Sequence, residues 1–137
     1  MNHWLVKTEP DTWSWDDQVK HGRTNWDGVR NHQAHNNLKA MKTGDRVFFY
    51  HSGDERRIVG VVEVGRERVP DPGDKTGKFG MVEMKTVMPV KTPVTLTAIK
   101  AEPKLQDLLL VRHSRLSVMP IDAASWALLC KMAGIKP

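Results

Sequence analysis

The sequence predicts an α+β fold with a barrel-like arrangement of strands and short flanking helices. Segments rich in Val, Ile and aromatic residues, typical of strands, recur along the chain. Short helical patterns interrupt them without the regular alternation of a doubly wound parallel sheet. With 137 residues, the chain has the size of one domain, expected to span residues 1–137, and is long enough to bury a core.

Five segments are expected to be strands because β-branched and aromatic residues dominate them. They cover residues 3–7, 46–52, 57–66, 79–88 and 115–121. Trp4 in the first strand is assigned to the core. Glu9-Pro10 is expected to end this strand without a direct passage into a helix, because the residue before a proline resists helical conformation. Gly53-Asp54 separates the second strand from the third, which favours an antiparallel pair. Residues 70–77 are expected to form an exposed loop, either a lid or a plain connection.

Three helices have recognisable ends. Ser14 is placed to cap the first, two acidic residues follow it in the first turn, and His21-Gly22 closes the helix. A second helix is expected over residues 32–41. Asp122 is placed to cap the last helix, in which Trp126 and other apolar residues recur at helical spacing and are expected to face the core.

The charge balance favours polyanions as partners. Lys and Arg outnumber Asp and Glu by 21 to 16, which gives a net charge of +5 and a pI of about 9.5. The charges are dispersed along the chain, so this indication is moderate. The lone Cys130 cannot form an internal disulfide, and neither a long apolar run nor a signal-type N-terminus is present. A cytoplasmic setting without a membrane role is therefore expected.

Common catalytic motifs are absent from the sequence. It has no phosphate-binding glycine loop, nucleophile elbow, zincin motif or cysteine pair. His32 and His35 stand three apart on an expected helix, but they lack further ligands and are interpreted as surface residues. His51 and Ser52 are neighbours on a strand, so they point to opposite faces and cannot form a dyad. We therefore expect a non-catalytic protein without a metal or other cofactor.

Two segments join flat aromatic rings to fixed hydrogen-bonding groups. They are Trp26-Asp-Gly-Val-Arg-Asn31 and Phe48-Phe-Tyr-His-Ser52. Nucleobases stack on such rings, with about 1–3 kcal/mol per base, and have edges that require hydrogen bonds. Taken alone, aromatic residues more often fill a core. Of Trp13 and Trp15, at most one is expected to line a cavity, because alternate residues of a helix do not share a face.

Six motifs, in the same order, resemble the EVE domain. They are WLVKTEPD (4–11), WDGVRN (26–31), VFFYHS (47–52), IVGVVE (58–63), PDP (70–72) and SRLSVMP (114–120). The resemblance runs from Trp4 to about Leu129, and the motifs together are highly specific. It implies a PUA-like mixed β-barrel, or pseudobarrel, with flanking short helices, related to YTH domains.

The resemblance also implies a function. Its expected partner is nucleic acid, DNA or RNA, that contains a modified base. The base would be a methylated or hydroxymethylated cytosine, or a methyladenine, flipped out of its strand into an aromatic pocket. Because the chain has no nuclease segment, any cleavage would need a separate nuclease or modification enzyme as partner.

The same resemblance implies the ligand-binding residues. They are Thr8, Glu9, Trp26, Arg30, Asn31, Tyr50, Ser52, Phe79, Arg115 and Ser117. Trp26 matches one wall of an aromatic cage, and Phe79 lies near another wall, where many relatives have Trp. Asn31 is expected to hydrogen-bond the edge of the base. Thr8 replaces the family's usual serine, keeping a hydroxyl group but adding a methyl group. Glu9 is expected to accept from an exocyclic amino group, as carboxylates do from cytosine N4.

Several of these assignments have structural alternatives. Asn31 would equally suit the cap of the following helix. Tyr50 and Phe79 would suit the core, and Arg115 and Ser117 would suit a bracing role in the barrel.

Two other functions stay open. One is an RNA-binding accessory that recognises folded RNA without regard to base modification. The other is a module for a small molecule or a protein, whose binding would need no phosphate and would respond little to salt.

Overall fold

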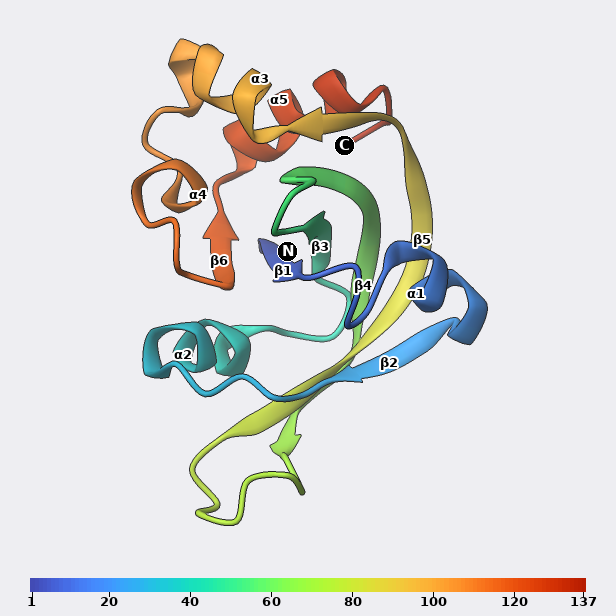
Figure 1. Ribbon diagram of the computed structural model, residues 1–137, viewed down its shortest axis with the longest axis vertical. Helices are drawn as coiled ribbons and strands as arrows, with labels where there is room; N and C mark the ends of the chain where they lie inside the picture. Colours follow the sequence, from blue (N-terminus) through green and yellow to red (C-terminus); the bar gives the residue numbers. More distant parts are fainter.

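The computed structural model describes residues 1–137 and contains one six-stranded sheet (Figure 1). The strands are β1 (His3–Thr8), β2 (Arg23–Trp26), β3 (Arg46–His51), β4 (Arg57–Pro70), β5 (Gly80–Thr95) and β6 (Val118–Ile121). They lie in the order β2-β5-β4-β3-β1-β6. β1 and β3 are parallel, and every other neighbouring pair is antiparallel. The sheet is therefore mixed, as the resemblance implied.

The expected α+β fold with a mixed, barrel-like sheet and short helices is confirmed, and the sheet curls without closing into a full barrel. β4 and β5 are long strands that bend around β1 and β3 (Figure 1). Their register shifts repeatedly between Ile58 and Val69, and such bulges increase the bend and twist of a strand pair. β2 and β6 do not pair with each other and remain the two edges of the sheet.

Five helices and one 3₁₀ turn connect the strands. They are α1 (Trp15–His21), α2 (His32–Ala40), α3 (Leu96–Ala101), the turn Pro103–Leu105, α4 (Leu109–Arg112) and α5 (Ala123–Ala133). Ser14 and Asp17 form a capping box, and Asp122 accepts from the Ser125 N–H at 3.0 Å. These caps confirm the two helix starts expected from the sequence. None of the helices has the length and apolar character needed to cross a membrane.

The structure contains more β-structure than the sequence predicts. β2 is unpredicted because its residues, Arg-Thr-Asn-Trp, form no strand-type run and depend on pairing with β5. The strands expected over 57–66 and 79–88 continue to Pro70 and Thr95, because their pairing extends past exposed charged residues. β6 begins only at Val118, so residues 115–117 precede it.

Aromatic residues of β3 pack on different partners. Phe48 stacks on Trp126 of α5 with ring centroids 3.9 Å apart. Phe49 meets the rings of Trp15 and Trp26 edge-on, at 5.2 and 5.6 Å. All five side chains are buried, so β3 ties α1, β2 and α5 to one hydrophobic core.

A close approach between α1 and β4 requires a glycine. Trp15, the first residue of α1, packs over Gly60, where an added Cβ would overlap the indole ring. The backbone N–H of Trp15 also donates to His51 Nε2 at 2.9 Å. The start of α1 is therefore fixed to β3 and β4.

His35 is buried, so its interpretation as a surface residue is wrong. The residue is 5% exposed because α2 packs this side against the start of β5. His35 Nε2 accepts from the Gly80 N–H at 2.9 Å. Burial lowers the pKa of His35, which favours the neutral ring that can accept this bond.

Asp71 joins the loop after β2 to the loop between β4 and β5. Its carboxylate accepts from the Gly28 N–H at 2.9 Å, the Gly73 N–H at 2.8 Å and Arg30 Nη1 at 2.9 Å. The side chain is only 3% exposed. These contacts, the Gly28 bond first, hold the pKa of the Asp71 carboxyl below its usual value. We call this arrangement the Asp71 latch.

Gly60→Ala should lower the free energy of unfolding by about 1–3 kcal/mol, because the added methyl group enters the space of the Trp15 ring. Urea unfolding followed by circular dichroism would measure the loss. The double variant with Trp15→Leu should lose less than the sum of the single losses, because the smaller side chain vacates that space. Additive losses would contradict the proposed contact.

Asp71→Asn should destabilise the fold by about 1–3 kcal/mol at neutral pH, because a buried carboxylate with three donors becomes an amide. The folded-state pKa is depressed, so the stabilisation is present above the unfolded value of about 3.9 and is lost as the pH falls through the folded pKa. The gap between wild type and variant should therefore narrow in acid. Urea unfolding at several pH values, with the exposed Asp54→Asn as control, would measure it. A gap that does not change with pH would contradict the role of the latch.

Candidate functional site

A cavity of about 510 Å³ opens where distant parts of the chain meet. Its lining residues are Lys7, Thr8, Thr12, Trp13, Thr24, Asn25, Trp26, Asp27, Gly28, Val29, Arg30 and Ser117. They come from the end of β1, the turn before α1, β2 with its following loop, and the residue before β6. β1 and β2 are separated in the sheet by β5, β4 and β3. The curl of the sheet brings them together, and the cavity occupies the gap that incomplete closure leaves.

Trp26 forms a rigid aromatic wall of this cavity. It is the last residue of β2, pairs with Val82 of β5 and is 8% exposed. Its ring stands at 83° to that of Phe49. One part of the indole is thus held by the core, and the part that remains accessible lines the cavity.

Trp13 supplies a second indole from the turn before α1. Its Nε1–H donates to Gln18 Oε1 at 2.9 Å, and its ring centroid lies 5.0 Å from that of His21. Gln18 is fully buried, and its Nε2 donates to the Met84 carbonyl and to Thr86 Oγ1, each at 3.2 Å. The Gln18 amide is therefore fixed by β5, and it holds the edge of the Trp13 ring in turn.

Polar groups from β1 line the cavity opposite β2. Lys7 Nζ donates to the Ser114 carbonyl at 2.8 Å and lies 5.8 Å from the centre of the Tyr50 ring. Burial lowers the pKa of Lys7. Thr8 Oγ1 donates to the Trp13 carbonyl at 2.9 Å, which braces the turn that carries the second indole.

The loop after β2 contributes charged groups of both signs. Gly28 has a φ of 77°, a left-handed conformation that favours glycine, and its N–H is held by the Asp71 latch. Arg30 is paired with Asp71, yet its side chain remains 41% exposed. Asp27 is exposed, and its carboxylate has neither a hydrogen-bond partner nor an ion-pair partner in the structure.

Four of the residues expected from the sequence lie together in the cavity wall: Thr8, Trp26, Arg30 and Ser117. Their roles in ligand binding remain predictions. The structure does not bring the other expected residues to the cavity wall. These are Glu9, Asn31, Tyr50, Ser52, Phe79 and Arg115.

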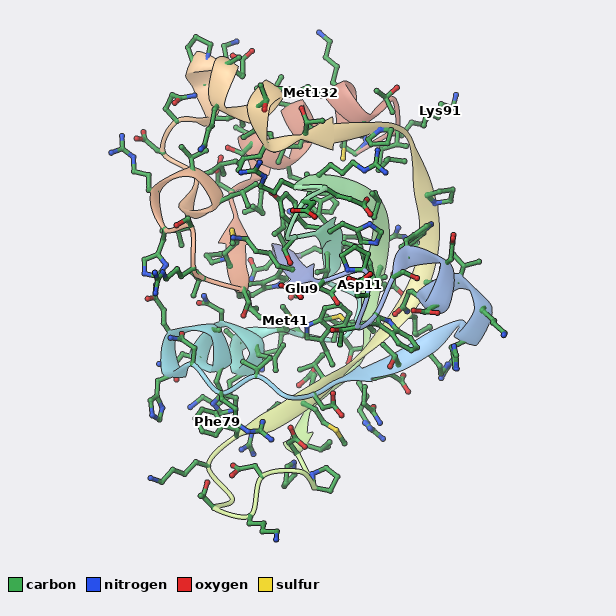
Figure 2. All side chains as sticks on the ribbon, in the orientation of Figure 1. Glu9, Asp11, Met41, Phe79, Lys91 and Met132 are labelled. Atoms are coloured by element: carbon green, nitrogen blue, oxygen red, sulfur yellow. The ribbon has the colours of Figure 1, made fainter.

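Three of these outlying residues have structural roles. Asn31 Oδ1 accepts from the Ala34 N–H at 2.9 Å and caps α2, which is the alternative left open above. Tyr50 is 2% exposed, and burial raises its pKa to about 12. Phe79 is buried beside α2 (Figure 2), with its ring 5.3 Å from that of His35.

The remaining three lie near the cavity or at the surface. The Glu9 side chain is exposed, while its carbonyl accepts from the N–H groups of Thr12 and Trp13 and so shapes the turn. The Ser52 N–H donates to the Thr8 carbonyl at 2.9 Å and ties the ends of β3 and β1 together. Arg115 is exposed.

Sequence reasoning missed several lining residues. Lys7, Asp27 and Gly28 stand inside the motifs that carry the family resemblance, and that position was a usable signal. The expectation that at most one of Trp13 and Trp15 lines a cavity is confirmed, because Trp15 lies in the core. The reason given for it is wrong, since Trp13 precedes the cap of α1 and does not lie on the helix. Nothing in the sequence showed which of the two it would be.

The cavity suits a planar, polar ligand. Two indoles provide flat apolar surface, and hydroxyl, amide, ammonium and carboxylate groups surround them. No group of three His, Cys, Asp or Glu side chains in the structure is placed to hold a metal ion.

Comparison with known proteins identifies relatives that align with most of this chain. The family model described as the EVE domain matches residues 2–132. Human thymocyte nuclear protein 1 is 32% identical over 154 residues, an alignment that covers 88% of this chain and 68% of that protein.

Solved structures share the fold. Rpa0253 from Rhodopseudomonas palustris superposes with a TM-score of 0.93 at 53% identity, covering 98% of this chain and 94% of that one. Human THYN1 protein, in a complex with 5-methylcytosine-containing DNA, gives a TM-score of 0.91 at 29% identity, and both chains are covered completely. The Mmi1 YTH domain gives a TM-score of 0.60 at 10% identity over 97% of this chain and 88% of that one, which shows a common fold alone. The chain therefore belongs to the EVE domain family.

Proposed function

We propose that this protein binds DNA without catalysis and holds a modified cytosine in the cavity lined by Trp13 and Trp26. The observation that carries the proposal is this pair of indoles, placed at the opening between β1 and β2. The human relative with the same fold was crystallised with DNA containing 5-methylcytosine. That complex supports a modified base in DNA over the other ligands considered for this chain.

Stacking would supply the main attraction. A flipped base that stacks on an indole gains about 1–3 kcal/mol, and extrusion from a duplex costs a few kcal/mol of unstacking and unpairing. The two indoles are already held by Phe49 and Gln18. Little ordering of side chains would therefore oppose binding.

The methyl group of the base would add a smaller term. Burial of one carbon contributes about 0.8 kcal/mol, which is roughly a fourfold change in affinity. Discrimination between cytosine and 5-methylcytosine by burial alone should thus be several-fold. Larger ratios would require a polar contact or a steric limit in the cavity.

Phosphate contacts would position the strand around the cavity. Arg30 at the cavity wall and Arg115 near Ser117 both have exposed side chains. Contacts of this kind release counterions and make affinity fall with salt. They carry no information about the base itself.

Binding to oligonucleotides that differ at one position should identify the modified base that the protein prefers. Matched DNA and RNA strands carrying cytosine, 5-methylcytosine, 5-hydroxymethylcytosine, adenine or N6-methyladenine would be compared by fluorescence anisotropy. We expect the tightest binding to DNA with one of the modified cytosines. Trp26→Ala should weaken that binding by about 1–3 kcal/mol.

Trp26 also contacts the core, so its removal can destabilise the fold. Trp13 is only half-buried, and Trp13→Ala therefore provides a second test that should disturb folding less. Binding that ignores the modification, prefers folded RNA or survives both substitutions would overturn the proposal. Binding of a free nucleoside that barely depends on salt would instead favour a small-molecule module.

Gln18→Met should weaken binding of the modified strand about three- to tenfold, because the Trp13 N–H loses its acceptor and the ring is free to turn. It should also destabilise the fold, since buried groups of β5 lose their donor. Gln106→Met is a matched control, because Gln106 donates to three backbone carbonyls away from the cavity. The control should lose stability and keep its affinity. Equal affinities of the two variants would contradict a positioning role for Gln18.

A further inference from the structure

Asp27 is the only acidic residue among those that line the cavity. Its carboxylate has no partner in the structure, although cationic side chains line the same cavity. Arg30 is paired with Asp71 through Nη1, and Lys7 Nζ donates to the Ser114 carbonyl. Asp27 is therefore a free acceptor in a wall whose cations have other contacts.

The backbone around Asp27 is fixed on both sides. Its own N–H donates to the Asn25 carbonyl at 3.0 Å, and the N–H of Gly28 donates to Asp71 at 2.9 Å. The amide oxygen of Asn25 is itself occupied by Arg66 at 3.0 Å. The turn that carries the Asp27 carboxylate is therefore already ordered, and the amide oxygen of Asn25 beside it already has a donor.

A free carboxylate is unfavourable beside a bound polyanion unless the ligand offers it a donor. Phosphate oxygens only accept hydrogen bonds, and they repel a negative side chain. The donors that a flipped base offers lie on its edge. The exocyclic amino group of cytosine is one of them, and carboxylates accept from this group.

We infer that Asp27 selects bases with an exocyclic amino group, cytosine-type bases above all, and discriminates against thymine and uracil. Thymine offers a single imide N–H between two carbonyl oxygens, and these oxygens would face the negative carboxylate. This inference rests on the proposed function, since it requires a base in the cavity. It also moves the role expected for Glu9, whose side chain lies outside the cavity, to Asp27.

The sharpest test compares 5-methylcytosine with thymine at one position of a single-stranded DNA. Both bases carry the same methyl group and ring, so they differ only along the edge that would face Asp27. A single strand also removes the difference in pairing with the opposite base. Wild-type protein should bind the 5-methylcytosine strand roughly tenfold more tightly, the scale of one well-placed base contact.

Asp27→Asn should reduce this ratio to about twofold or less, because an amide can donate to thymine O4 as well as accept from an amino group. Asp11→Asn is the control, since Asp11 (Figure 2) is exposed and does not line the cavity. It should keep the wild-type ratio. Circular dichroism would confirm that both variants are folded.

The outcomes separate this inference from the proposed function. If wild type prefers 5-methylcytosine and Asp27→Asn keeps the full preference, Asp27 does not read the base and the inference is overturned, while base binding stands. If wild type binds both strands equally and Trp13→Ala changes neither affinity, the cavity holds no base. Both proposals then fail.

Discussion

The coiled pairing of β4 with β5 is the constraint on which the rest of the structure depends. These two strands span residues 57–70 and 80–95, and their repeated register shifts bend them around β1 and β3. β5 carries β2 on its other edge, so the bend turns β2 toward the end of β1. A flat sheet of the same order would hold these two strands far apart. The cavity is thus a product of sheet curvature rather than of any one loop.

Local signals in the sequence were sufficient for most elements. Ser14 and Asp122 were identified as helix caps because a side-chain acceptor at that position acts within a few residues. β2 was not predicted, because it pairs with a part of β5 that lies far along the chain. The ends of β4 and β5 were not predicted, because their pairing continues past exposed charged residues that do not resemble a strand. Whether the sheet closes into a full barrel was also not predictable from local signals. It depends on how much curvature accumulates over several strands, which no short motif records.

The candidate site was predictable only in part, because a single sequence motif contains both cavity-lining residues and residues that stabilise the fold. The motif at residues 26–31 contains Trp26 and Arg30, which line the cavity, and also Asn31, which caps α2. Family motifs preserve residues for folding and for binding alike, and sequence alone does not separate the two. Tyr50 shows the same limit, because its strand is buried on both faces. Trp13 could be recognised as a lining residue only after the curl of the sheet had brought the turn before α1 and the end of β2 to one cavity.

The Asp71 latch has a consequence for the rate of recognition. It connects the loop after β2 to the loop between β4 and β5, so the cavity rim is ordered before any ligand arrives. A preformed rim needs no conformational change before a ligand can bind. Under the proposed function, the slow event in an encounter with a duplex would belong to the DNA, namely the opening of the base pair and the rotation of the nucleotide. Association should consequently accelerate where the duplex is already weak, at mismatches, frayed ends and single-stranded gaps, while dissociation from the filled cavity stays much the same.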